Sequence, residues 1–113
     1  MKRKVLENSI DKEIMATFTP FQIKVYQELI QIPAGQVISY QSLAKNAGSP
    51  KAARAVGHAM AINPCVPTIP CHRVVSASGK IGQYSVGGPS VKKALLLKEG
   101  VKIEGDQIIQ DIL

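Results

Sequence analysis

Apolar residues recur at helical spacing in the first half of the chain. They follow Thr19, a residue type favoured at the N-cap of a helix, and Pro20, which suits the first helical position. The apolar positions then lie three or four residues apart, on one face of a helix: Phe21, Val25, Leu29 and Ile32. This pattern predicts a helix over about 20–31, which the segment Pro33-Ala34-Gly35 ends.

A second, shorter helix is predicted after Val37-Ile38. Ser39 is a suitable N-cap, Leu43 and Ala44 are expected to face inward, and Asn46-Ala47-Gly48 stops the helix.

The pair Ser49-Pro50 repeats the N-cap and first-turn pattern, which predicts a third helix through Ala61. Ala53, Val56 and Met60 form its packing face, and Asn63-Pro64 ends it. Two helices joined by a short turn that contains glycine are typical of a helix-turn-helix.

The remaining segments carry weaker patterns. Residues 5–18 are compatible with a short strand or a helical turn. A turn is predicted at Ser78-Gly79-Lys80, and a hairpin around Gly105-Asp106 is predicted in the C-terminal tail. The expected fold is therefore mainly α with short β elements, a winged-helix-like helix-turn-helix domain that forms one compact unit.

Composition and charge narrow the choice of partner. The chain has 113 residues, of which 45% are hydrophobic, enough for one domain with a modest core. Fourteen Lys and Arg against eight Asp and Glu give a net charge of +6, which favours a polyanionic partner such as nucleic acid over a merely solvated basic surface. The sequence shows neither a signal peptide nor a run of membrane-spanning length, so we expect a cytoplasmic protein whose cysteines stay reduced.

The segment Pro70-Cys71-His72-Arg73 contains the strongest candidate chemistry. A cysteine needs a base or positive charge to react as a thiolate; His72 is a candidate base, and Arg73 is expected to add a favourable field. Adjacent side chains of an extended segment point apart, so the sequence alone leaves open a buried structural cysteine.

Metal and disulfide interpretations fit poorly. His58, Cys65, Cys71 and His72 lack the paired spacing of a zinc clip, and a Cys65–Cys71 disulfide would need an oxidising compartment. No metal and no cofactor are therefore expected.

The predicted third helix has an unusual composition for one that reads bases. It is rich in alanine and glycine, which permits close approach or tight helix packing but reads few base edges. Arg54 lies off the packing face, either as a solvated charge or as a side chain that takes the place of a displaced base.

Several ordered motifs together resemble the DNA-binding domain of the O6-alkylguanine-DNA alkyltransferases. The likeness covers about Thr19 to Val101. It rests on Val37-Ile38-Ser39-Tyr40-Gln41, Lys51-Ala52-Ala53-Arg54-Ala55-Val56-Gly57, Asn63-Pro64, Ile69-Pro70-Cys71-His72-Arg73-Val74-Val75, Gly82, Tyr84-Ser85, Gly87-Gly88, Leu96-Leu97 and Glu99-Gly100.

The resemblance implies roles for five catalytic residues. Cys71 would accept the alkyl group from O6 of guanine irreversibly. His72 would deprotonate Cys71 through a water, with Glu99 orienting the imidazole. Tyr40 would assist nucleotide rotation and protonate guanine N3, and Asn63 would tie the helix-turn-helix to the active-site strand.

The resemblance also implies a DNA face and a base pocket. Arg54 would fill the gap left by the flipped base, while the second helix enters the minor groove, where small side chains fit. The other expected DNA-binding residues are Lys51, Ala52, Ala53, Gly57, Tyr40 and Gln41. Residues 84–89 would form the loop over the flipped base. The expected pocket residues are Tyr84, Ser85, Gly87, Val74 and Met60.

Departures from the family leave alternatives. Only about eighteen residues precede Thr19, so we expect a short form with an extension at 1–18, an active domain at 19–101 and a hairpin tail at 102–113. Cys65 has no assignable family role. The expected partner is double-stranded DNA containing O6-alkylguanine, bound by a monomer. The alternatives are an alkyltransferase-like lesion-binding protein, which lacks the acceptor cysteine, a helix-turn-helix regulator, and a Cys-His hydrolase.

Overall fold

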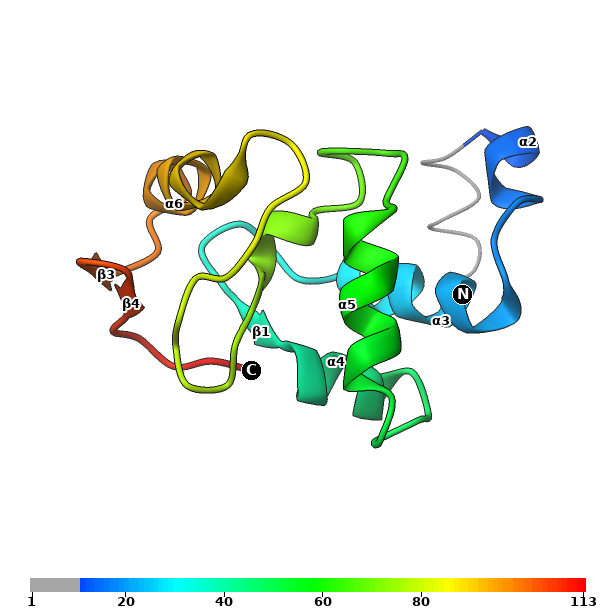
Figure 1. Ribbon diagram of the computed structural model, residues 1–113, viewed down its shortest axis with the longest axis horizontal. Helices are drawn as coiled ribbons and strands as arrows, with labels where there is room; N and C mark the ends of the chain where they lie inside the picture. The colour runs from blue at the N-terminus through cyan, green and yellow to red at the C-terminus, as the bar shows by residue number, and fades with distance from the viewer. Residues whose placement is uncertain (1–10) are drawn as a thin grey trace.

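The helix-turn-helix lies at the centre of the molecule. In the computed structural model, which describes residues 11–113, a short helix α2 (Lys12–Met15) precedes α3 (Pro20–Leu29), α4 (Tyr40–Asn46) and α5 (Ala53–Ala61). The three longer helices pack against one another, and α5 crosses in front of α3 and α4 (Figure 1). The predominantly helical fold is confirmed.

Local capping explains where the first two long helices begin. Thr19 and Gln22 form a reciprocal capping box at the start of α3, with bonds of 2.8 and 3.1 Å between each side chain and the other residue's backbone amide. Ser39 Oγ accepts the Ser42 amide at 3.0 Å at the start of α4. Both predicted N-caps are confirmed, as is the burial of Leu43 and Ala44.

The predicted start of the third helix is wrong. Ser49 does not cap it: α5 begins at Ala53, and no side chain caps the helix at Ala52. The reason is that the Ser49 amide donates to the Ala44 carbonyl, while its own carbonyl accepts from Ala52, so Ser49 closes the end of α4. Of the predicted packing face, Val56 and Met60 are buried, but Ala53 is half-buried and Ala59 takes the inward position.

Short strands connect the helices to the rest of the chain. β1 (Ile38–Ser39) pairs in parallel with β2 (Val74–Val75), with Ile38 opposite Val74. A 3₁₀ turn, η1 (Cys71–Arg73), leads directly into β2. β1 also leads directly into α4, so the strand pair fixes the active-site turn relative to the helix-turn-helix.

The second half ends in a helix and a hairpin. Helix α6 (Gly88–Lys98) is followed by β3 (Ile103–Glu104) and β4 (Gln107–Ile108), which pair antiparallel around Gly105-Asp106 as predicted. The turn predicted at 78–80 is also present, since the Gly79 amide donates to Ser76. The weakly patterned residues 12–15 form the helical turn that was one of the two predictions; residues 5–10 lie outside the described part of the chain.

Two hydrophobic clusters form the core. The larger one joins α3, α4 and α5 to the segment that carries Ile69, Cys71 and Val74. The smaller one joins Val37 and Val75 to α6 and the terminal hairpin. Val74 and Val75 of β2 belong to different clusters, as do Ile38 of β1 and Val37 directly before it, so the strand pair connects the two halves of the molecule. Within residues 11–113 no helix is long and apolar enough to span a membrane.

Candidate active site

The active-site segment is a pair of tight turns and not an extended strand. Pro70 has φ −81° and ψ 68°, and the Cys71 amide donates to the Ile69 carbonyl across it at 2.8 Å, which is an inverse γ-turn. The 3₁₀ turn of Cys71–Arg73 follows immediately. The concern that adjacent side chains of an extended segment point apart therefore does not apply to Cys71 and His72.

Asn63 fastens this turn to the end of α5. Its Nδ2 donates to the Ile69 carbonyl at 2.7 Å, and its Oδ1 accepts the Cys65 amide at 2.9 Å. The side chain is buried and satisfied at both ends. The helix-turn-helix and the thiol-bearing segment are thus joined through a single amide group.

Cys71 is buried at the edge of a pocket of about 230 Å³. The pocket lies between α4, α5 and the loop before α6, and its lining comprises Tyr40, Gly57, Met60, Ala61, Cys71, Gln83, Tyr84 and Ser85. Six of these residues are among the predicted site residues. Val74 is not in the lining, because it is fully buried in the core.

The loop over the pocket is shorter than predicted. Residues 88 and 89 already belong to α6, and Gly87, at φ 107°, is the N-cap of that helix and not a pocket residue. A left-handed backbone suits glycine here, and a Cβ at this position would lie 2.5 Å from the Val91 side chain.

Burial opposes ionisation of the thiol. Desolvation raises the pKa of Cys71, and a hydrogen bond with Asn63 and the charge of Lys92 counteract it only partly. Burial, and then the proximity of Cys71, also raises the pKa of the Tyr40 and Tyr84 hydroxyls. All three groups are therefore neutral at pH 7, and Cys71 needs a base at the moment it reacts.

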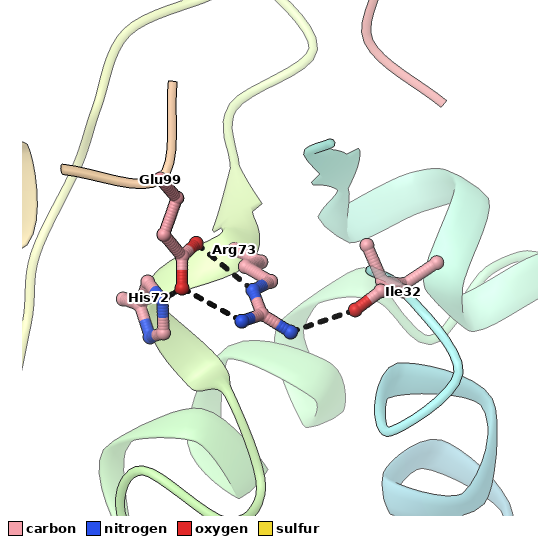
Figure 2. A network of polar contacts seen from close by, with 4 residues as sticks. All are labelled: Ile32, His72, Arg73 and Glu99. Atoms are coloured by element: carbon pink, nitrogen blue, oxygen red, sulfur yellow. Dashed lines mark hydrogen bonds and ion pairs between the residues drawn. The ribbon is translucent and has the colours of Figure 1, made fainter. Parts of the chain in front are cut away.

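His72, the residue after Cys71, contacts a carboxylate through one of its two ring nitrogens. Its Nε2 lies 3.0 Å from Glu99 Oε2, while its Nδ1 is buried without a hydrogen-bond partner among the described residues (Figure 2). The His72 and Tyr84 rings meet edge to face with centroids 6.4 Å apart. Glu99, at the C-terminal end of α6, is thus not the solvated helix-end charge that its sequence position alone suggests.

The expectation that Arg73 supplies a field for the thiolate is wrong. Arg73 Nη2 and Nε donate to the two oxygens of Glu99 at 2.7 and 3.0 Å. These bonds, more than any other contact, hold the pKa of Glu99 below its usual value. The cation that acts on Cys71 is Lys92, which the sequence analysis missed.

Lys92 is almost completely buried in the middle of α6. Its Nζ donates to the carbonyl oxygens of Val74 and Gln83 at 2.7 and 3.1 Å, and burial lowers its pKa to about 8. The sequence gives little sign of this, because Lys92 is followed by a second lysine, Lys93. Lysines are seldom fully buried, so sequence alone favoured a surface position.

The predicted DNA-binding residues lie on α4, on α5 and in the turn between these helices. Gln41 is exposed in the first turn of α4, and Arg54 is exposed in the first turn of α5. Lys51 is exposed and Ala52 half-buried in the turn between these helices. Gly57 and Tyr40 belong both to this region and to the pocket lining, so the pocket opens beside the exposed basic residues.

The remaining candidates for metal or redox chemistry do not come together. Cys65 and Cys71 are both free thiols, and Cys65 packs against the larger core cluster. Within residues 11–113, no three His, Cys, Asp or Glu side chains are grouped so that they would hold a metal ion.

A helix-turn-helix packed against a pocket that contains a buried thiol defines a class of small DNA-binding domain with a reactive cysteine. The family model for the 6-O-methylguanine DNA methyltransferase DNA-binding domain matches residues 20–101. The chain belongs to this family, and the resemblance inferred from the sequence is confirmed.

Individual relatives agree with this assignment. The methylated-DNA--protein-cysteine methyltransferase of Homo sapiens is 61% identical over 69 residues, 61% of this chain and 33% of the human protein. The crystal structure of Mycobacterium tuberculosis OGT in complex with DNA superposes with a TM-score of 0.69 at 48% identity, over 73% of this chain and 50% of that one.

A second similar structure also contains DNA. The structure of S. pombe Atl1 in complex with damaged DNA containing O6-carboxymethylguanine has a TM-score of 0.67 at 35% identity, over 74% of this chain and 79% of Atl1. By contrast, the chain spans 32% to 33% of the length of its mammalian relatives.

Proposed function

We propose that this protein repairs DNA by moving an alkyl group from O6 of guanine to Cys71 in one irreversible step. The observation that carries the proposal is the buried Cys71 thiol at the edge of a pocket that opens beside the helix-turn-helix. A base inside a duplex cannot present O6 to such a thiol, so the nucleotide must first rotate into the pocket.

The chemical step is a displacement at carbon. His72 Nδ1 takes the thiol proton through a bridging water, and Glu99 stabilises the resulting imidazolium. The Cys71 sulfur then bonds to the alkyl carbon while the carbon–O6 bond breaks, and its electron pair passes to guanine. Tyr40 donates a proton at N3, so guanine leaves neutral. The raised pKa of Cys71 supports the need for a base.

The DNA face is proposed to act in the minor groove. Ala52, Ala53 and Gly57 offer little side-chain bulk, which suits a groove that is about 6 Å wide. Arg54 takes the place of the rotated nucleotide, while Lys51 and Gln41 contact the backbone. Because such contacts are mainly electrostatic, binding depends weakly on sequence and strongly on salt. We propose that the protein binds as a monomer.

A second candidate function is recognition of the lesion without transfer. The likeness to Atl1, matched over 79% of its length, favours it. The two functions differ in one requirement: alkyl transfer needs a nucleophile in the pocket, and the Cys71 sulfur supplies one. The damage-binding function requires only the pocket and the helix-turn-helix.

Mass spectrometry decides between them. The protein is mixed with an equimolar duplex that contains one O6-methylguanine, and intact protein and peptides are weighed. We expect one added methyl group, on the peptide that carries Cys71, and none in Cys71→Ala. Cys65→Ala is the matched control, which should still gain the methyl group. Selective binding of the lesion with no gain in mass would establish the second function instead.

A further inference from the structure

Arg73 connects three separate segments through one planar side chain. Its Nε and Nη2 donate to the two carboxylate oxygens of Glu99 at 3.0 and 2.7 Å, and its Nη1 donates to the Ile32 carbonyl at 2.8 Å (Figure 2). Glu99 ends α6, and Ile32 follows α3. Only 17% of each charged side chain is exposed. This two-pronged geometry fixes the plane of the carboxylate, which a lysine cannot do.

The fixed carboxylate determines the hydrogen-bonding state of His72. Glu99 Oε2 is shared between Arg73 Nη2 and His72 Nε2, at 2.7 and 3.0 Å. Because an ionised carboxylate can only accept, Nε2 must carry the imidazole proton. The lone pair then lies on Nδ1, which has no partner among the described residues. The contact of Nε2 with Glu99 therefore leaves Nδ1, on the other side of the ring, as the nitrogen that can accept a proton in the proposed reaction.

Arg73 also balances the negative charge of Glu99 beside the His72 ring. The groups around His72 include Glu99 and Lys98 from α6, Cys71 and Arg73 from the turn, and Tyr84 from the loop. Of the two positively charged residues in this group, Lys98 and Arg73, it is Arg73 that forms an ion pair with Glu99.

We propose that Arg73 is a positioning residue for the alkyl transfer, which acts on His72 through Glu99. It holds the carboxylate in the position that keeps the proton on Nε2 and the lone pair on Nδ1. This inference rests on the proposed function, since it assigns Arg73 a part in that reaction. It does not require Arg73 to touch DNA, the alkyl group or Cys71.

Two substitutions separate the geometry from the charge. Arg73→Lys keeps the positive charge but loses the two-pronged contact, so we expect transfer at pH 7 to slow about 10-fold. Arg73→Gln also removes the charge that pairs with Glu99, so transfer should be at least as slow as in Arg73→Lys. Lys102→Gln removes an exposed positive charge beyond the end of α6; it is the control and should change neither the transfer rate nor the tautomer.

A second measurement does not depend on repair. The ¹⁵N signals of the His72 ring report its tautomer and protonation directly, and His58→Ala removes the other histidine from the spectrum. We expect the Nε2–H tautomer in the wild-type protein and a larger share of the Nδ1–H tautomer in Arg73→Gln. If the wild-type protein transfers no methyl group, the repair proposal fails, while the ring signals still test the action of Arg73 on His72.

Clear results would overturn the proposal. It fails if Arg73→Gln leaves the transfer rate and the ring signals as in the wild-type protein, or if the wild-type protein has the Nδ1–H tautomer. If circular dichroism shows that Arg73→Gln does not fold, Arg73→Lys alone decides: full wild-type rate in that variant shows that the two-pronged contact has no part in the reaction.

Discussion

Lys92 Nζ donates a 2.7 Å hydrogen bond to the carbonyl oxygen of Val74, which joins the middle of α6 to the strand that follows the active-site turn. A second bond, to Gln83, holds the loop over the pocket. One buried ammonium group thus links the strand, the loop and the helix around Cys71. Its positive charge is also among the factors that lower the pKa of this thiol.

Lys92→Met is expected to slow alkyl transfer about 10-fold, because the thiolate loses a nearby positive charge and one pKa unit corresponds to a tenfold change. Stability should change less, since replacing a buried charge by an apolar side chain of similar size is often neutral. Single-turnover transfer rates and urea unfolding measure the two effects. Lys93→Met, on the next residue of α6, is the control; an equal loss of rate there would contradict the prediction.

The pH dependence of stability should carry a contribution from Lys92. Its pKa is about 8 in the folded protein and 10.5 in the reference state, so between these values the unfolded chain binds a proton that the folded protein lacks. Stability from this group therefore rises with pH across that window. Urea unfolding from pH 7 to 10 should show the wild-type protein gaining stability relative to Lys92→Met. A constant difference would show that Lys92 keeps its proton.

Asn63→Asp tests the link between α5 and the active-site turn. The carboxylate can still accept the Cys65 amide, but it cannot donate to the Ile69 carbonyl, which keeps only the Cys71 amide as a donor and now faces a second acceptor. We expect a loss of about 1–3 kcal/mol in the free energy of unfolding, and slower transfer. Asn63→Ala loses both hydrogen bonds. It should be less stable than the wild-type protein, and its alkyl transfer should be at least as slow as that of Asn63→Asp. Wild-type transfer by Asn63→Asp would show that this bond does not position Cys71.

Gly57→Ala should separate stability from function. Gly57 lies within α5, and a Cβ there would meet nothing within 4 Å, so the change is expected to stabilise the helix by about 1 kcal/mol. The same methyl group would enter the pocket lining, so binding of a lesion-containing duplex should weaken. Thermal unfolding and fluorescence anisotropy measure the two effects. Tighter binding together with higher stability would place the DNA face elsewhere.

Local signals explain what the sequence could predict of the fold. The starts of α3 and α4 were predictable because their caps lie within three residues of the helix, at Thr19 and Ser39. The start of α5 was not, because Ser49 bonds to Ala44 instead, and its local pattern is equally compatible with either arrangement. The N-cap at Gly87 was likewise hidden among loop residues.

The candidate site divides in the same way. Cys71 and His72 could be proposed from adjacency, and Glu99 and Tyr40 from the family resemblance. The environment of each group could not be predicted. Arg73 pairs with a residue 26 positions away, and Lys92 is buried by a strand 18 positions away. The positions of charged residues in the sequence do not show which of them meet across such separations. The sequence analysis therefore named Arg73, and not Lys92, as the positive charge near the Cys71 thiol.

The last residue of the chain lies against β1. The Leu113 amide donates to Val37 at 2.9 Å, and its carbonyl accepts the Ser39 amide at 3.0 Å, directly before α4 (Figure 1). A fluorophore attached after Leu113 would therefore start beside the helix-turn-helix. Energy transfer to a dye on the DNA could then follow docking of the duplex in real time. Deleting the last residues would instead remove both bonds and leave the edge of β1 open.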